Sequence, residues 1–246
     1  MHGITFETVA LIFLLAGLVK GVAGMGLPTV AMGLLGLVAA PAQAAALVVI
    51  PSLVTNLWQF LSGRRWLALA RRTWPMLAAI GLATWESAGL MTGPGAARAL
   101  TWLGLVLVVY AAIGLAKIRI SVPARHEAWL SAAVGAATGL VTGATGVFVI
   151  PAVPYLQALG FEKDNLVQVL GLSFTTSTLA LAAGLASRGA FRLSEAGASA
   201  LCVAPALIGM TVGQAIRTRV NPATFRLIFL AGLALLGADL IARSMM

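Results

Sequence analysis

Long apolar runs separated by short polar connections dominate the pattern along the chain. Three of these runs, residues 21–63, 128–161 and 165–187, contain no Asp, Glu, Lys or Arg. The first run is longer than the about 20 residues that one helix needs to cross a membrane, so it must contain more than one segment. The alternation expected of membrane β-strands is absent. The pattern therefore predicts an all-α polytopic membrane protein.

Ten hydrophobic segments can be delimited by their polar connections. They are 4–20, 27–39, 43–62, 73–91 and 98–116, followed by 128–142, 147–159, 164–186, 195–216 and 223–242. The first two segments of each half are short: as helices, 27–39 and 147–159 would cover about 20 Å of the about 30 Å of hydrocarbon. We therefore expect each half to contain a glycine-broken pair of short helices, followed by three longer transmembrane helices.

A repeated glycine motif indicates that the two halves are related. The segment Gly17-Leu-Val-Lys-Gly21-Val-Ala-Gly24 returns as Gly139-Leu-Val-Thr-Gly143-Ala-Thr-Gly146, with five of eight positions identical. A proline follows each copy, at Pro28 and Pro151. Paired hydrophobic segments interrupted by Gly and Pro in two halves point to the binding site of a transporter. We divide the chain into a first repeat, 1–119, and a second repeat, 120–246, within one membrane domain.

The short pairs decide how the two repeats are oriented. If both arms of a pair cross the membrane, or both re-enter, each half crosses an odd number of times and the repeats are inverted. If a pair makes one broken crossing, the repeats are parallel. With Lys20 left out, the inverted arrangement places eleven basic residues on one side and four on the other, against ten and five for the parallel one. Because cytoplasmic loops are enriched in Lys and Arg, this count favours inverted repeats with both termini outside.

Composition agrees with a membrane protein and narrows the function. Hydrophobic residues make up 60% of the chain and charged residues 9%, whereas about a quarter of the residues of a soluble domain are charged. The net charge of +9 lies at the ends of apolar runs, which is typical of topology and lipid headgroup contact and not of nucleic-acid binding. The sequence contains one Cys, no His/Cys/carboxylate cluster with metal-ligand spacing and no base beside a nucleophile. We expect no metal, no cofactor and no enzymatic activity.

The glycine motifs could form an anion site. Their glycines leave backbone N–H groups unshielded, and the helix that follows each break begins with N–H groups that lack partners. These glycines are Gly21, Gly24 and Gly26 in the first half, and Gly143 and Gly146 in the second. Two such helix starts that meet inside the membrane would bind an anion. The alternative is close helix packing, because both motifs also fit the small-xxx-small pattern.

Each half also carries a patch of hydroxyl and amide side chains on one helix face. The patches consist of Ser52, Thr55, Asn56 and Gln59 in the first half, and of Ser173, Thr176 and Ser177 in the second. Such donors can replace part of the hydration shell of an oxyanion, so we expect them to line a substrate pathway. The alternative is that they bond to their own helix or join neighbouring helices.

Two ionisable residues are candidates for direct roles. Lys20 adjoins the first glycine break, where it could attract an anion or reach to the interface; Thr142 is its counterpart, and Thr145 belongs to the second motif. Glu86 is the only acidic residue inside an apolar run of the first half. There it could couple transport to protons as a buried carboxyl, or serve as a hydrogen-bonded structural acid.

At these motifs the chain resembles the TauE/SafE sulfite-exporter family, also called TSUP. The resemblance rests on Gly17 to Pro28, on Gly139 to Pro151, and on Gly171-Leu-Ser-Phe-Thr-Thr-Ser-Thr178. It implies a transporter in the inner (plasma) membrane for sulfur-containing anions such as sulfite or organosulfonates, commonly in export. First halves of the family often have three consecutive glycines before the proline, where this chain has Gly24-Met-Gly26-Leu-Pro28.

Together these observations predict a secondary transporter that exports small sulfur-containing anions by alternating access, driven by the membrane potential, by protons or by both. Two alternatives stay open: a proton-coupled anion uptake permease, and a non-transporting membrane scaffold subunit. The expected partners are a small anionic substrate and the lipid bilayer, with no nucleic acid. A homodimer is among the assemblies that the sequence allows.

Overall fold

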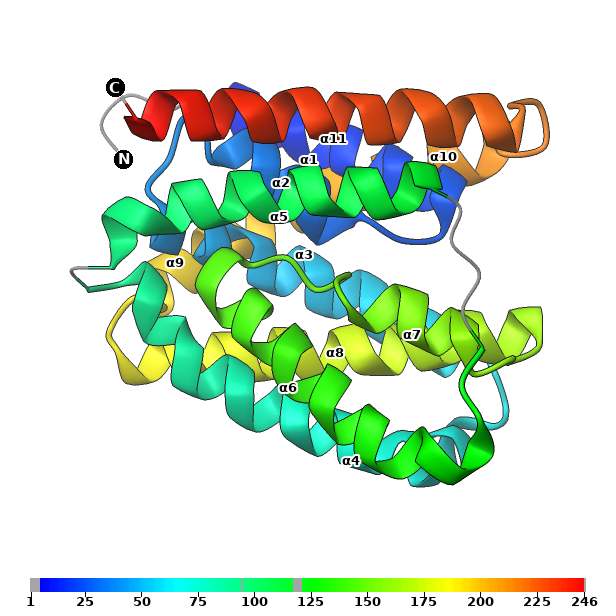
Figure 1. Ribbon diagram of the computed structural model, residues 1–246. Helices are drawn as coiled ribbons and strands as arrows, with labels where there is room; N and C mark the ends of the chain where they lie inside the picture. Colours follow the sequence, from blue (N-terminus) through cyan, green and yellow to red (C-terminus); the bar gives the residue numbers. More distant parts are fainter. Residues whose placement is uncertain (1–4, 94, 117–120, 246) are drawn as a thin grey trace.

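The computed structural model of the protein describes residues 5–93, 95–116 and 121–245, which form helices and no strand (Figure 1). In chain order the elements are α1 (Phe6–Ala23), α2 (Leu27–Leu35), α3 (Pro41–Leu61), α4 (Trp66–Ser87), the short 3-10 helix η1 (Ala88–Met91), α5 (Ala96–Ala116), the 3-10 helix η2 (Ala124–His126), α6 (Glu127–Thr145), α7 (Ala152–Ala158), α8 (Lys163–Ser187), α9 (Leu193–Leu201), α10 (Val203–Ile216) and α11 (Pro222–Met245). The expected boundary between the repeats, at 119/120, lies outside the described residues.

Seven helical stretches of the described chain are long and apolar enough to cross a membrane, with α9 and α10 counted as one stretch. The ten predicted segments all correspond to helices. However, the prediction that the first segment of each half is short is wrong. α1 has 18 residues and α6 has 19, about 27 and 28 Å of helix, and only α2 and α7 are short. The expected ends came too early because Gly21 and Gly143 continue the helices instead of ending them.

The third glycine of each motif ends its helix. Gly24 and Gly146 have φ angles of 78° and 71°, a left-handed conformation that is costly for residues with a Cβ atom. In this position the N–H of Gly24 donates to the carbonyl of Lys20, and that of Gly146 donates to the carbonyl of Thr142, both at 2.7 Å. This glycine cap is a common way to close a helix. The repeated sequence therefore forms the same local structure twice.

The helices pair across the two halves of the chain. α1 of the first half packs along α10 of the second, and α6 of the second half packs along α4 of the first. The two other large contacts join α3 to α8 and α5 to α11; the latter pair runs along the top of the bundle in Figure 1. If α9 and α10 are taken together as the fourth segment of the second half, each long helix packs on its counterpart or in a reciprocal pair.

Backbone-to-backbone contact explains why the first two glycines of each motif are helical. A Cβ atom on Gly17 would collide with the carbonyl oxygen of Ala206 in α10, and one on Gly139 would lie 2.7 Å from the carbonyl oxygen of Ile80 in α4. Gly21 and Gly143 lie equally close to the same two partner helices. The small-xxx-small pattern thus brings α1 onto α10 and α6 onto α4.

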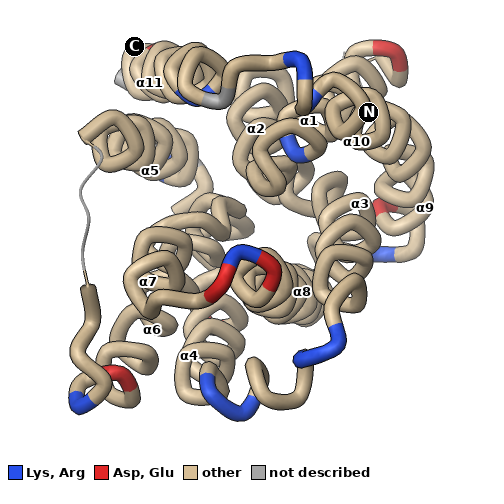
Figure 2. Tube along the Cα trace, turned by 90° about the vertical axis from the view of Figure 1, so that its right-hand side faces the viewer, with Lys and Arg blue, Asp and Glu red and all other residues tan. Residues whose placement is uncertain are grey.

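Basic residues concentrate at one end of the bundle, where α3 ends and where α4, α6, α8 and α11 begin. Figure 2 looks onto this end and shows Lys and Arg around its rim. The residues are Arg64, Arg65, Arg71, Arg72, Arg125, Lys163, Arg217, Arg219 and Arg226, whereas Arg98, Arg188, Arg192 and Arg243 belong to the opposite end. Lys117 and Arg119, which are expected at the basic end, lie outside the described residues. The start of α1 and the end of α11 lie at the opposite end (Figure 1).

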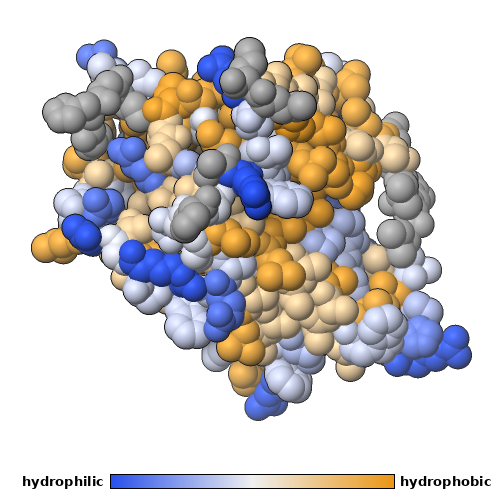
Figure 3. Space-filling view, turned by 60° about the vertical axis from the view of Figure 1, so that its left-hand side comes forward, coloured by the Kyte–Doolittle hydropathy of each residue, from blue (hydrophilic) through white to orange (hydrophobic). Residues whose placement is uncertain are grey.

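The outer surface of the long helices is apolar. Large hydrophobic side chains such as Leu82, Trp58 and Leu235 are exposed, and hydrophobic residues cover much of the face shown in Figure 3, with hydrophilic ones in separate patches. A surface of this kind is stable against lipid and would be unusual in a soluble monomer. The chain is a multi-pass membrane protein.

Candidate functional site

Lys20 and Asn56 form a buried polar contact between α1 and α3. Both side chains are almost fully enclosed, with exposed fractions of 4% and 0%. The ammonium group of Lys20 donates a hydrogen bond to the amide oxygen Oδ1 of Asn56. No carboxylate of the described residues lies within ion-pair distance of Lys20. An uncompensated buried cation is costly, so this position favours the approach of an anion.

Buried donors without partners accompany this contact. Within the described part of the chain, six buried side-chain atoms have no hydrogen-bond partner: Thr29 Oγ1, Ser52 Oγ, Asn56 Nδ2, Thr84 Oγ1, Ser173 Oγ and Ser177 Oγ. Four of them belong to α3 and α8, which pack on one another. Buried polar groups are usually paired, and each unpaired one costs about 1–3 kcal/mol. Donors that remain free in both halves are suited to hold a polar ligand.

The contact of α3 with α8 is closed by two glutamines. Gln59 Nε2 donates to the Val167 carbonyl of α8, and Gln168 Nε2 donates to the Phe60 carbonyl of α3, each at 2.9 Å. Gly171 allows the close approach, since a Cβ atom there would lie 2.6 Å from the Phe60 nitrogen. Gln59 therefore joins α3 to α8. This agrees with the alternative interpretation that the polar patches hold neighbouring helices together. The reciprocal pair, here called the glutamine clasp, lies between the free donors of α3 and α8 and the basic end.

The threonines among the predicted pathway residues bond back to their own helices. Thr55 donates to the carbonyl of Pro51 at 2.8 Å, Thr176 to that of Leu172 at 3.1 Å, and Thr142 and Thr145 to residues 138 and 141 at 2.7 Å. The proton of each of these hydroxyl groups is already donated to a backbone carbonyl. Unless the side chain rotates, such a threonine can accept a hydrogen bond from a ligand but cannot donate one. Their place in a substrate pathway stays a prediction, and the serines and Asn56 are better donors.

The glycine breaks differ between the halves. The expectation that Gly21 and Gly143 belong to non-helical tips is wrong, because both pack inside helices. Gly24 and Gly26 do lie in the break between α1 and α2, where a Cβ atom on Gly24 would meet nothing within 4 Å. Gly146 instead lies against Met32 of α2, with 2.8 Å between the Cβ position and the Met32 sulfur. The second break therefore contacts the short helix of the first half.

The expectation that Glu86 is buried is wrong. Its side chain is exposed, and it is the next-to-last residue of α4. Its backbone carbonyl accepts a hydrogen bond of 3.0 Å from the guanidinium group of Arg188, which also donates to the carbonyl of Trp85. The apolar run misled the assignment because it continues past the end of α4 into the 3-10 helix η1. Proton coupling by Glu86 stays a prediction, without the burial that motivated it.

A serine that the sequence did not single out supports the site. Pro51 lacks an N–H group, so the Leu47 carbonyl, one turn earlier in α3, loses its helical donor. Ser199 of α9 donates to this carbonyl at 2.8 Å and accepts from the Ile50 nitrogen at 3.0 Å. The repair holds α3 directly before Ser52. A proline inside a predicted apolar helix was the available signal, but the sequence could not identify the donor.

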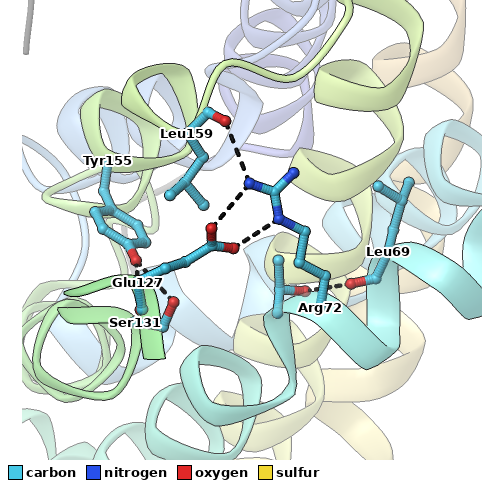
Figure 4. A network of polar contacts seen from close by, with 7 residues as sticks. Leu69, Arg72, Glu127, Ser131, Tyr155 and Leu159 are labelled. Atoms are coloured by element: carbon cyan, nitrogen blue, oxygen red, sulfur yellow. Dashed lines mark hydrogen bonds and ion pairs between the residues drawn. The ribbon is translucent and has the colours of Figure 1, made fainter. Parts of the chain in front are cut away.

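A second polar network ties three helices together at the basic end (Figure 4). The guanidinium group of Arg72 donates to both carboxylate oxygens of Glu127, at 2.6 and 2.9 Å, and more weakly to the Leu159 carbonyl. The Tyr155 hydroxyl donates to the Glu127 carbonyl at 3.0 Å and lies 2.7 Å from the Ser131 hydroxyl. A bidentate pair of this kind fixes orientation well. The network holds α7 against the starts of α4 and α6.

Comparisons with known proteins identify the family. Among the described residues, no group of three or more His, Cys, Asp or Glu side chains could hold a metal ion. Searches of curated proteins and of solved structures found no match. The family model described as sulfite exporter TauE/SafE, in contrast, matches residues 9–240. Since this match covers nearly the whole length, the chain belongs to the TauE/SafE sulfite exporter family.

Proposed function

We propose that the protein exports small sulfur-containing anions of the sulfite or organosulfonate type across the inner (plasma) membrane. We further propose that Lys20, Asn56, Ser52, Ser173 and Ser177 form the substrate site. Membership of the family supports the substrate class. One observation carries the site: a buried Lys20 whose partner is a neutral amide, close to helices with unpaired donors in both halves.

The chemistry of these residues suits an oxyanion. Sulfite is stabilised in water by donors on each oxygen, and a site that removes this water must supply donors in return. The ammonium of Lys20, the free Nδ2 of Asn56 and the serine hydroxyls are all donors. A hydrogen bond to a charged group contributes about 1.5–3 kcal/mol, so a few of them can offset the cost of dehydration.

Alternating access between inverted repeats is the transport mechanism that we propose. Two features support it. The helices pair in the way a two-fold relation between the halves requires. α3 packs on α8 and α5 on α11, while α1 packs on α10 of the second half and α6 packs on α4 of the first. The described basic residues concentrate at the end opposite the start of α1, and this excess of Lys and Arg supports a cytoplasmic location for that end. In such transporters one repeat rocks against the other around a fixed site.

The membrane potential is sufficient to drive export. With a negative interior, each exported negative charge gains about 2.3 kcal/mol per 100 mV. Proton coupling would need a carboxyl inside the transport pathway, and Glu86 lies exposed near the end of α4. Potential-driven export therefore has more support than proton-coupled uptake. A scaffold subunit would not require unpaired donors in both α3 and α8.

Reconstitution in liposomes tests this function. Sulfite is loaded inside or outside, a potassium diffusion potential of either sign is imposed, and the flux is measured for the wild type and two variants. Lys20→Met removes the buried charge, whereas Lys163→Met removes an exposed charge at the start of α8 and serves as the matched control. We expect Lys20→Met to lose saturable flux and Lys163→Met to keep it. Normal flux in Lys20→Met would contradict the site, and no wild-type flux under any gradient would contradict transport.

A further inference from the structure

A cavity lies at the basic end of the bundle. Its volume is ≈ 380 Å³, within the range of small-molecule sites. It is partly open and is lined by the end of α1, the last turns of α5, the short helix α7 and the segment from Arg217 into α11. None of the predicted pathway residues lines it. The lining residues therefore differ from those of the proposed substrate site, although Val22 and Ala23 follow directly after Gly21 in α1.

The walls of this cavity are apolar and aromatic. The ring of Tyr110 meets that of Phe229 edge to face, with centroids 6.4 Å apart, and Phe229 stacks on Phe225 at 6.3 Å. Val153 of α7 and Leu230 of α11 belong to the rest of the apolar lining. Tyr110 and Phe229 are only half-buried, so their faces remain available to a ligand. Such walls favour a chain or a ring that leaves water.

The polar part of the lining is cationic. Arg217 and Arg226 both line the cavity, and no Asp or Glu among the described residues does. The guanidinium group of Arg226 donates to the Gly114 carbonyl at the end of α5, which holds it at the edge of the cavity. The side chain of Gln157 adds a donor from α7. Two arginines beside an apolar space match a molecule that carries an anionic group at one end.

We propose that this cavity binds an anion attached to an apolar chain or ring, with the anionic group at Arg217 and Arg226 and the apolar part against Tyr110, Phe229 and Val153. Such a ligand can come from two sources: a soluble organic anion, such as an alkyl sulfonate, or an anionic membrane lipid. Both ligands join an anionic group to an apolar part. A lipid could reach the cavity because the basic end lies where lipid headgroups gather. The proposal does not depend on the role of Lys20.

Hexanesulfonate is a suitable soluble probe. The purified protein is placed in phosphatidylcholine nanodiscs, and the binding of hexanesulfonate is measured by calorimetry beside two controls, methanesulfonate without the chain and hexanol without the charge. Three variants are compared: Arg217→Gln combined with Arg226→Gln, Ile113→Trp, which fills the cavity, and Arg98→Gln, which removes an exposed arginine from the opposite end. The arginine changes lie at exposed positions and should not disturb folding even if Ile113→Trp does.

We expect saturable binding of hexanesulfonate and much weaker binding of both controls. The double arginine variant should bind at least about tenfold more weakly, as expected for a lost charged hydrogen bond, and Arg98→Gln should bind as the wild type does. Equal binding of hexanesulfonate and hexanol, or equal affinity in all variants, would overturn the proposal. Sulfite flux in the Lys20 experiment is measured separately, so failure here does not affect the proposed function.

Native mass spectrometry distinguishes the two sources. The protein is released from nanodiscs that contain phosphatidylglycerol and phosphatidylcholine in equal amounts. Retained phosphatidylglycerol that is lost in the double arginine variant and displaced by hexanesulfonate would assign the cavity to an anionic lipid. Hexanesulfonate binding without preferential retention of phosphatidylglycerol would assign it to a soluble organic anion. If neither ligand binds in an arginine-dependent way, the proposal is wrong.

Discussion

Ser199 of α9 donates the hydrogen bond that Pro51 removes from the Leu47 carbonyl of α3. The same hydroxyl accepts from the Ile50 nitrogen, so one buried serine satisfies two backbone groups at the proline. In hydrocarbon a free backbone group is costly, and neighbouring helices commonly supply the missing partner. The position of Ser52 and Asn56 in the proposed site therefore depends on a side chain of the other half of the chain.

Ser199→Ala should destabilise the protein, because it leaves the Leu47 carbonyl and the Ile50 nitrogen without this partner. We expect a loss of about 1–3 kcal/mol in the free energy of unfolding, the typical cost of unsatisfied buried groups. Thermal unfolding in detergent measures the effect. Ser244→Ala, at an exposed serine near the end of α11, is the control and should unfold as the wild type does. Equal stability of both variants would show that α3 relaxes around Pro51 without help.

The glycines of the first motif should respond differently from a glycine outside it. Gly17→Ala places a methyl group against the Ala206 carbonyl of α10, and backbone cannot move aside cheaply. We expect a loss of at least about 1–3 kcal/mol, as for other overpacked sites. In α9, Gly197→Ala meets nothing within 4 Å and should be neutral or stabilising, since alanine favours helix more than glycine does. Unfolding measurements on both variants test the packing role, and a harmless Gly17→Ala would contradict it.

The contrast among these glycines shows what the sequence could and could not predict. Apolar runs, divided at polar connections and at the Gly and Pro breaks, located all ten helical segments, because these signals are local in sequence. The role of each glycine was harder: Gly21 packs against α10 and stays helical, while Gly24, three residues later, adopts a positive φ and ends the helix. Which role a glycine takes depends on the partner helix, and that partner is about 190 residues away in sequence.

The candidate site was predictable only in part for the same reason. Lys20 and Asn56 were each recognised as unusual polar residues in apolar surroundings, but nothing local indicates that they bond to one another. Glu86 was misplaced because an apolar run does not show where a helix leaves the membrane. The role of Ser199 can be recognised only in the folded structure, since its hydroxyl bonds to the Leu47 carbonyl that Pro51 leaves without a donor in the other half of the chain. Local patterns identified polar candidates, and tertiary contacts decided which of them meet.

Opening of the glutamine clasp should expose the site to the basic end. Gln59→Leu combined with Gln168→Leu removes both hydrogen bonds between α3 and α8. A cysteine at Ser173, in a background of Cys202→Ala, should then react faster with a charged thiol reagent added at the basic end. The same cysteine with an intact clasp is the control. Unchanged reactivity would mean that the clasp fastens the helices without controlling access.

Glu86→Gln should leave transport unchanged. The side chain is exposed near the end of α4, so it lacks the shielded position inside the protein that proton coupling needs. Sulfite flux in liposomes, measured with an imposed pH gradient and with an imposed potential, should be the same as in the wild type. A variant that keeps its response to potential but loses its response to pH would restore Glu86 as the proton-coupling residue. It would also favour the uptake alternative over potential-driven export.

Asn56→Leu and Thr176→Val should separate the donors of the site from the structural hydroxyls. Asn56→Leu removes both the partner of Lys20 and the free Nδ2 donor, while Leu keeps a similar volume. Because a hydrogen bond to a charged ligand contributes about 1.5–3 kcal/mol, sulfite should bind roughly 10- to 150-fold more weakly. The hydroxyl proton of Thr176 is already donated to the Leu172 carbonyl, so Thr176→Val should change affinity much less.

The affinities can be measured by the sulfite dependence of thermal unfolding, since a ligand that binds only the folded protein raises its stability with concentration. Unfolding without sulfite provides the control, because it shows how far each substitution changes the fold itself. If both variants weaken binding equally, Thr176 must turn its hydroxyl from the helix to the substrate. The whole second patch, Ser173, Thr176 and Ser177, would then bind the anion. If neither does, the buried contact of Lys20 with Asn56 is a structural bond between α1 and α3, and the anion binds elsewhere in the protein.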